Sequence, residues 1–149
     1  PSVVQRFLAE ENSTSVDAQK LCFVINYGLN DYFSGYSTED YRKGLEDGVR
    51  ALQAAYPEAK ILIVSSNFIS SFHNGTEKKN PQREILSDFV AAAEESAADL
   101  QVDFLNVNNS LQWDASNVNN YMADAVHPNE QGRFLFGAAV IRALEEILL

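Results

Sequence analysis

The sequence predicts a single α/β domain built on a parallel sheet with helices on both faces. Three segments, at residues 21–25, 61–64 and 102–107, are rich in apolar residues over successive positions, as in strands buried on both sides. Amphipathic segments with helical periodicity lie between them, and this alternation is typical of right-handed crossovers between parallel strands. The chain contains no internal repeat and no linker rich in Pro and Gly, so we expect residues 1–149 to form one domain.

Composition and charge exclude several classes of protein. Of the 149 residues, 46% are hydrophobic, which is enough for a core and too much for a disordered chain. No apolar run approaches the roughly 18 residues of a membrane span. The net charge of -10 repels phosphate groups and anionic lipids, so we expect neither a nucleic acid nor a membrane as a partner. A single cysteine allows no internal disulfide.

The first half of the chain supplies two of the predicted strands. Apolar residues at helical spacing predict a short helix within residues 1–10, and the first strand follows at 21–25. Ser37 has the character of an N-cap, and the helix that it opens ends at Pro57. The second strand, at 61–64, leads into a long polar loop.

The second half repeats this pattern. Pro81 is expected to begin a helix that runs to about Leu100, and the strand at 102–107 follows. An Asn-rich segment then leads to a terminal helix after Pro128 and Asn129. We expect the buried stripe of this helix to consist of Phe134, Ala138, Ile141 and Leu148.

Polar clusters follow the strands, at the edge where open α/β sheets hold their ligands. In one of them, Asp124 lies three residues before His127. A carboxylate at this spacing can accept the Nδ1 proton of the imidazole and leave Nε2 free as a base. Alternatively, Asp124 caps a turn and His127 is an ordinary surface residue. The other histidine, His73, is expected in a solvated loop.

A second cluster, Gly28-Leu29-Asn30-Asp31, follows the first strand. Gly28 permits a sharp exit from the sheet, and the side-chain amide of Asn30 can stabilise a developing oxyanion. Taken alone, these residues also fit an ordinary turn. Together the two clusters favour a functional site over an ordinary turn, because both fall at the carboxyl ends of predicted parallel strands.

With these two motifs, Gly28-x-Asn30-Asp31 and Asp124-x-x-His127-Pro128, the sequence resembles the SGNH (GDSL) hydrolase family of esterases and lipases. The resemblance implies a three-layer, flavodoxin-like parallel sheet and the hydrolysis of an ester. It implies that His127 is the general base, that Asp124 orients it, and that Asn30 donates into the oxyanion hole. It implies neither a metal nor an organic cofactor.

The resemblance also predicts what this chain lacks. The family carries its nucleophilic serine in a Gly-Asp-Ser motif on the first strand of the sheet, and the sequence contains no such motif. We expect the chain to lack the first two strands of the fold, to be inactive alone, and to expose residues 21–25 as an edge open to pairing. It is then a segment of a longer protein, a partner of another chain that supplies the serine, or a natural truncation. Ser34, Ser65 and Ser66 lack the Gly-flanked turn of a nucleophile, and we assign none of them.

The substrate is expected to be a small ester. Aromatic and amide side chains are common in the predicted loops, and such groups suit the sugar rings of an O-acetylated carbohydrate. These side chains are Tyr27, Tyr32, Phe33, Tyr36, Asn67, Phe68, Trp113 and Tyr121. Of the polar and aromatic residues near the motifs, we expect Gly28, Asp31, Tyr32 and Asn67 to contact substrate.

The alternative is a non-catalytic α/β module that binds a small molecule or a glycan. A nucleotide-binding flavodoxin-like domain is disfavoured, because no Gly-rich phosphate loop follows a strand.

Overall fold

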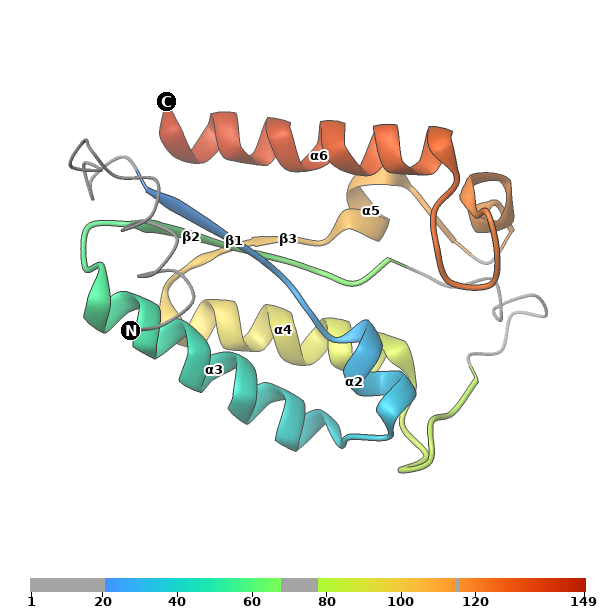
Figure 1. The fold of residues 1–149 in the computed structure, drawn as a ribbon, viewed down its shortest axis with the longest axis horizontal. Helices are drawn as coiled ribbons and strands as arrows, with labels where there is room; N and C mark the ends of the chain where they lie inside the picture. The colour runs from blue at the N-terminus through green and yellow to red at the C-terminus, as the bar shows by residue number, and fades with distance from the viewer. Residues whose placement is uncertain (1–20, 68–77, 115) are drawn as a thin grey trace, which may run out of the picture.

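The computed structural model describes residues 21–67, 78–114 and 116–149 (Figure 1). The predicted helix within residues 1–10 lies outside this part, as do His73 and Phe68. No helix in the described part is long and apolar enough to cross a bilayer.

The sheet has three parallel strands, which are β1 (Cys22–Asn26), β2 (Lys60–Val64) and β3 (Asp103–Leu105). Their order is β1-β2-β3, so β2 is the central strand. It is buried from Ile61 to Val64, as its continuous apolar run predicts. In β1 the prediction of burial on both faces is wrong at Val24, which is 45% exposed. Among the described strands β1 has a neighbour on one side alone, and an edge strand is less completely covered.

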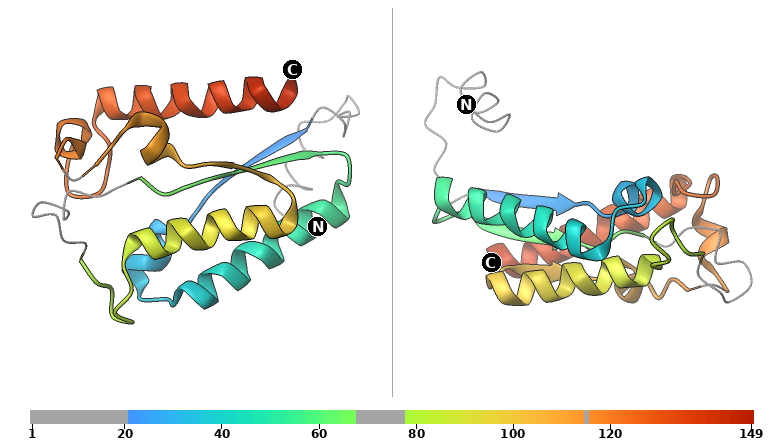
Figure 2. Two further views of the ribbon diagram at one scale, coloured as in Figure 1. Left: turned by 180° about the vertical axis from the view of Figure 1, so that it is seen from behind. Right: turned by 90° about the horizontal axis from the view of Figure 1, so that it is seen from below.

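Helices cover the two faces of the sheet, as the alternation of elements predicts (Figures 1 and 2). On one face lie α3 (Thr38–Ala55) and α4 (Leu86–Leu100), which enclose a core around Ile63, Phe89 and Val49. On the other face lie α5 (Val107–Leu111) and α6 (Glu130–Leu148), packed on Leu62 and Val64. The side chains of β2 thus point alternately into two cores, and the domain has three layers.

Helix α4 begins later than predicted, at Leu86 and not at Pro81. The side-chain oxygen of Asn80 accepts hydrogen bonds from the backbone N–H groups of Gln82 and Glu84, at 2.9 and 3.0 Å. Arg83 adopts a positive φ of 67° in the same turn. A residue with positive φ cannot continue an α-helix, so the chain makes a turn after Pro81 before the helix starts.

The predicted buried stripe of α6 is wrong at three of its four positions. Phe134, Ile141 and Leu148 are 74%, 59% and 52% exposed. The helix instead packs a neighbouring face on the sheet, with Ala139 buried and Val140 and Leu144 partly buried. Apolar residues lie on more than one face of α6, so periodicity alone does not select the face that meets the sheet.

The third strand is shorter than predicted, because Asn106 ends it by capping the next helix. Its side chain accepts a hydrogen bond from the backbone N–H of Asn109 and so starts α5 directly after β3. The Asn-rich segment then forms α5 and a 3-10 turn, η3 (Val118–Tyr121), and both stand between β3 and the loop that carries His127.

Candidate active site

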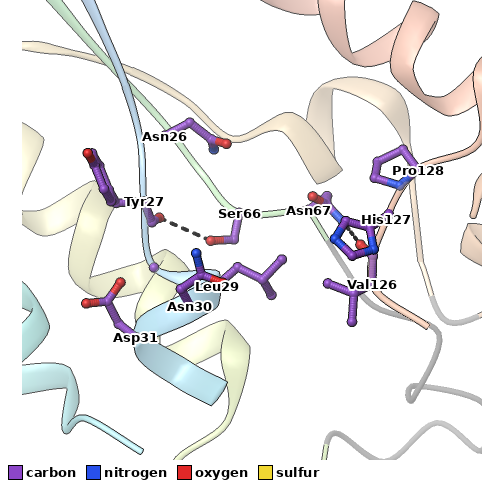
Figure 3. A pocket seen from close by; sticks show the side chains of 11 residues that line it. Asn26, Tyr27, Leu29, Asn30, Asp31, Ser66, Asn67, Val126, His127 and Pro128 are labelled. Atoms are coloured by element: carbon purple, nitrogen blue, oxygen red, sulfur yellow. Dashed lines mark hydrogen bonds between the residues drawn. The ribbon is translucent and has the colours of Figure 1, made fainter. Parts of the chain in front are cut away.

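A pocket of about 280 Å³ opens at the carboxyl ends of β1 and β2 (Figure 3). The turn between β1 and α2 (Leu29–Ser34) forms one side, the end of β2 forms the floor, and the loop before α6 forms the other side. The lining residues are Asn26, Tyr27, Gly28, Leu29, Asn30, Asp31, Ser66, Asn67, Val126, His127 and Pro128. This is the edge at which the polar clusters of the sequence were expected to meet.

Most of the residues singled out in the sequence meet at this pocket. Gly28, Asn30 and Asp31 reach it from the β1–α2 turn, Asn67 from the end of β2, and His127 from the opposite loop. Figure 3 shows Asn30 and His127 on opposite sides of the floor formed by Ser66. Two motifs distant in sequence therefore face one space.

Tyr32 is the exception among the predicted substrate contacts. Its side chain is 3% exposed, packs edge-on against Phe89, and donates a hydrogen bond from its hydroxyl to the carbonyl of Lys78. Trp113 is likewise buried, stacked on Tyr121 with a centroid separation of 5.3 Å. Of the aromatic residues expected around the substrate, Tyr27 lines the pocket, whereas the side chains of Tyr32 and Trp113 are buried in the interior of the domain.

The carboxylate of Asp124 organises the loop that carries His127. Its Oδ1 accepts hydrogen bonds from the backbone N–H groups of Val126 and His127, at 2.8 and 2.7 Å. Its Oδ2 lies 2.8 Å from Nδ1 of the His127 ring. The same side chain therefore caps the turn and contacts the imidazole.

These contacts set the charge state of Asp124. The backbone N–H groups of His127 and Val126, followed by the His127 ring, lower the pKa of the carboxyl to about 2. Asp124 is therefore ionised throughout the range in which an imidazole exchanges its proton. An ionised acceptor at Nδ1 favours the tautomer with its proton there, which leaves Nε2 available as a base.

Backbone pairing braces the two ends of this loop. The N–H of Ala123 donates to the carbonyl of His127, and the N–H of Asn129 donates to the carbonyl of Tyr121, both at 2.8 Å. A Cβ on Gly132 would lie 2.2 Å from that same Tyr121 oxygen. A glycine at this position lets the first turn of α6 approach the loop closely, which explains its place shortly after the histidine.

The β1–α2 turn places Asn30 on the other side of the pocket. Gly28 has a φ of 116°, and a Cβ there would lie 3.1 Å from Oγ of Ser66 and 3.2 Å from the ring of Tyr41. The chain can reverse here because Gly28 tolerates this conformation, and α2 (Leu29–Ser34) starts at once. Asn30 is exposed in the first turn of α2, and its side chain points into the pocket (Figure 3).

The side chains of both serines at the end of β2 make hydrogen bonds to the backbone. The Oγ of Ser66 donates to the carbonyl of Tyr27 at 3.1 Å, and the Oγ of Ser65 accepts from the N–H of Val107 at 3.0 Å. Both side chains are buried and tie elements together. In the described part of the chain we find no serine arranged as a nucleophile beside His127.

Three residues of the pocket, Asn26, Leu29 and Val126, are not among those predicted from the sequence. The amide of Asn26 donates to the carbonyls of Val64 and Ser65, at 3.1 and 2.9 Å, and so links the ends of β1 and β2. Leu29 and Val126 pack against the core beneath the pocket. Leu29 and Val126 lie within the two motifs, and Asn26 lies two residues before the first one. This proximity was the signal in the sequence that could have identified them.

No metal site accompanies this arrangement in the described ranges. Among these residues no three side chains of the types His, Cys, Asp and Glu come together as possible ligands. The side chains that line the pocket include the imidazole of His127, the carboxylate of Asp31 and the amides of Asn30 and Asn67.

Comparison with known proteins identifies the family. The chain belongs to the GDSL-like lipase/acylhydrolase family, whose model matches residues 3–133. The fold is similar to that of a protein from Lactobacillus plantarum, with a TM-score of 0.74 and 21% identity, over 91% of this chain and 71% of that one. It is also similar to a lipase/acylhydrolase from Enterococcus faecalis, with a TM-score of 0.65 and 18% identity, over 85% and 62% of the two chains.

A mutant of an acetyl-xylooligosaccharide esterase from Geobacillus Stearmophilus has a similar fold as well, with a TM-score of 0.62 and 18% identity, over 95% of this chain and 67% of that one. At such identities the similarity shows the fold alone. The chain spans 60% of a GDSL-like lipase from Parabacteroides merdae and 62% of the Enterococcus protein. No curated protein matches the sequence.

We predict that Gly28→Ala destabilises the domain by about 1–2 kcal/mol, because an alanine is strained at this positive φ. Gly44→Ala is the matched control, since Gly44 is exposed within α3 and a Cβ there meets nothing within 4 Å. The control should leave stability unchanged or raise it by up to about 1 kcal/mol. Urea denaturation of both variants makes the comparison, and equal stabilities would contradict the role of Gly28.

A second prediction concerns the stability of the fold at acid pH. Because the folded-state pKa of Asp124 lies below its ordinary value of 3.8, its ionisation stabilises the fold above that value. This stabilisation is lost as the pH falls towards about 2. The difference in Tm between the wild type and Asp124→Asn should therefore shrink as the pH falls from about 4 to about 2. Thermal unfolding across this range measures it, and a difference independent of pH would disprove the linkage.

Proposed function

We propose that this chain carries the general base and an oxyanion donor of an SGNH-type ester hydrolase, with the nucleophilic serine outside the chain. One observation carries the proposal: His127, paired through Nδ1 with Asp124, and Asn30 lie on the same pocket. A base and a hydrogen-bond donor on two sides of one space are the groups that acyl transfer requires.

In the proposed reaction, Nε2 of His127 takes the proton of the serine hydroxyl as its oxygen attacks the ester carbonyl. The charge that develops on the carbonyl oxygen is stabilised by the side-chain N–H of Asn30. The protonated imidazole then gives its proton to the departing alcohol, which leaves an acyl-serine. Water, deprotonated by the same nitrogen, attacks the acyl group and releases the acid, so that ester and water become acid and alcohol.

The outer edge of β1 is where we propose that the segment carrying the serine pairs. Val24 on this strand is 45% exposed, and no described strand pairs with its outer side. A serine at the carboxyl end of a parallel strand beside β1 would lie at the same edge of the sheet as Asn30. This segment belongs either to a longer form of the protein or to a partner chain.

For the substrate we propose an ester with a short acyl group, with an O-acetylated carbohydrate as the leading class. The pocket is small, at about 280 Å³, and its lining mixes amides with the apolar side chains of Leu29 and Val126. An acetyl-xylooligosaccharide esterase is among the proteins of similar fold. The exposed ring of Tyr27 at the rim offers a face on which a sugar could stack.

We predict that His127→Ala lowers kcat for p-nitrophenyl acetate in the full-length protein by about 10²- to 10⁴-fold, because the proton acceptor is lost. Asn30→Ala should lower kcat by about 10²- to 10³-fold, because one oxyanion donor is lost. Asn117→Ala, which breaks hydrogen bonds in a loop away from the pocket, is the matched control and should keep the wild-type rate.

Unchanged turnover in His127→Ala would remove this residue from the mechanism. A wild-type protein that binds acetylated oligosaccharides but releases no acetate would favour the alternative of a non-catalytic binding module. Acetate release can be followed directly in the same samples, so the two outcomes are distinguishable.

A further inference from the structure

Little packing holds the ring of His127 in place. Its side chain is 76% exposed, and the side chain of its partner Asp124 is 58% exposed. Both belong to one short turn, in which the carboxylate bonds the backbone N–H groups as well as the ring. The pair is therefore fixed within one turn, and its position relative to Asn30 depends on what attaches this turn to the sheet.

Val126, the residue directly before His127, provides this attachment. Its side chain packs against the core between the sheet and α3 and α4. Its carbonyl accepts a hydrogen bond from the side-chain amide of Asn67, at 3.3 Å (Figure 3). Asn67 comes three residues after the end of the central strand β2 and directly follows the buried residues Ser65 and Ser66, so the donor is attached to a buried segment of the chain.

The neighbouring residue secures the opposite side of the pocket. Ser66 donates to the carbonyl of Tyr27 in the β1–α2 turn, at 3.1 Å, and its own carbonyl accepts from the buried amide of Asn108, at 2.8 Å. Two consecutive residues at the end of β2 thus hold the two halves of the site. Ser66 holds the turn that carries Asn30, and Asn67 holds the loop that carries His127.

From these contacts we infer that Asn67 is a positioning residue for His127: its amide holds the Val126 carbonyl and thereby sets the distance between the base and the oxyanion donor. This inference rests on the proposed function. It differs from the substrate contact that the sequence predicted for Asn67, because the amide is engaged with the backbone of the loop. A displacement of about 1 Å in catalytic geometry can cost about 10²-fold in rate, so the effect should be measurable.

The test is a double-mutant cycle in the full-length protein with p-nitrophenyl acetate as the substrate. Asn67→Ala removes the donor, and Asn67→Asp removes it while keeping the volume of the side chain. Both should lower kcat by about 10- to 100-fold and change KM by less than about 3-fold. In a His127→Ala background neither should lower the remaining rate further, because a residue that acts through the imidazole has no effect once the imidazole is gone. Asn117→Ala again serves as the control.

Three outcomes would overturn the inference: an unchanged kcat in both variants, a rise in KM at constant kcat, or an equal loss with and without His127. The second would make Asn67 a substrate contact, and the third a residue that acts independently of the base. If His127→Ala alone leaves turnover intact, the proposed function fails, and the inference fails with it. Melting temperatures verify folding, and Asn67→Asp, which creates no cavity, is decisive if Asn67→Ala does not fold.

Discussion

The site depends on one carboxylate. Asp124 accepts hydrogen bonds from two backbone N–H groups and from the imidazole, so a single side chain both shapes the turn and orients the ring that the turn presents. Because the His127 side chain is largely exposed, packing contributes little to holding the ring. The backbone donors lower the pKa of the carboxyl, and an ionised carboxylate favours the ring tautomer that carries its proton on Nδ1.

The position of the turn that carries His127 depends on its contact with the segment that follows β2. This strand is buried between two cores, and the polar residues that follow it reach in opposite directions, Ser66 to the β1–α2 turn and Asn67 to the histidine loop. The two loops that carry Asn30 and His127 are in this way both hydrogen-bonded to residues that follow the same buried strand. Preorganisation of this kind is what electrostatic stabilisation of a transition state requires, since donors that had to move during the reaction would contribute less.

Membership of the family and the geometry of the site contribute different things. At about one-fifth sequence identity, similarity to solved structures establishes the fold and leaves the chemistry open. The placement of His127, Asp124 and Asn30 supports ester hydrolysis, and the serines at the end of β2 are occupied in structural hydrogen bonds. In the proposed function, the segment that carries the serine pairs with the outer side of β1, which no described strand covers.

Local features were readable in the sequence because they depend on neighbours along the chain. The spacing of Asp124 and His127, the cap at Ser37 and the buried run of β2 are of this kind. Tertiary structure alone decided which face of α6 meets the sheet, that Tyr32 belongs to the core, and that Asn67 supports the histidine loop. Each of these outcomes depends on which surfaces meet across the domain. Periodicity marks a face as apolar, and only the packing of distant elements determines what that face, or a polar side chain beside it, will contact.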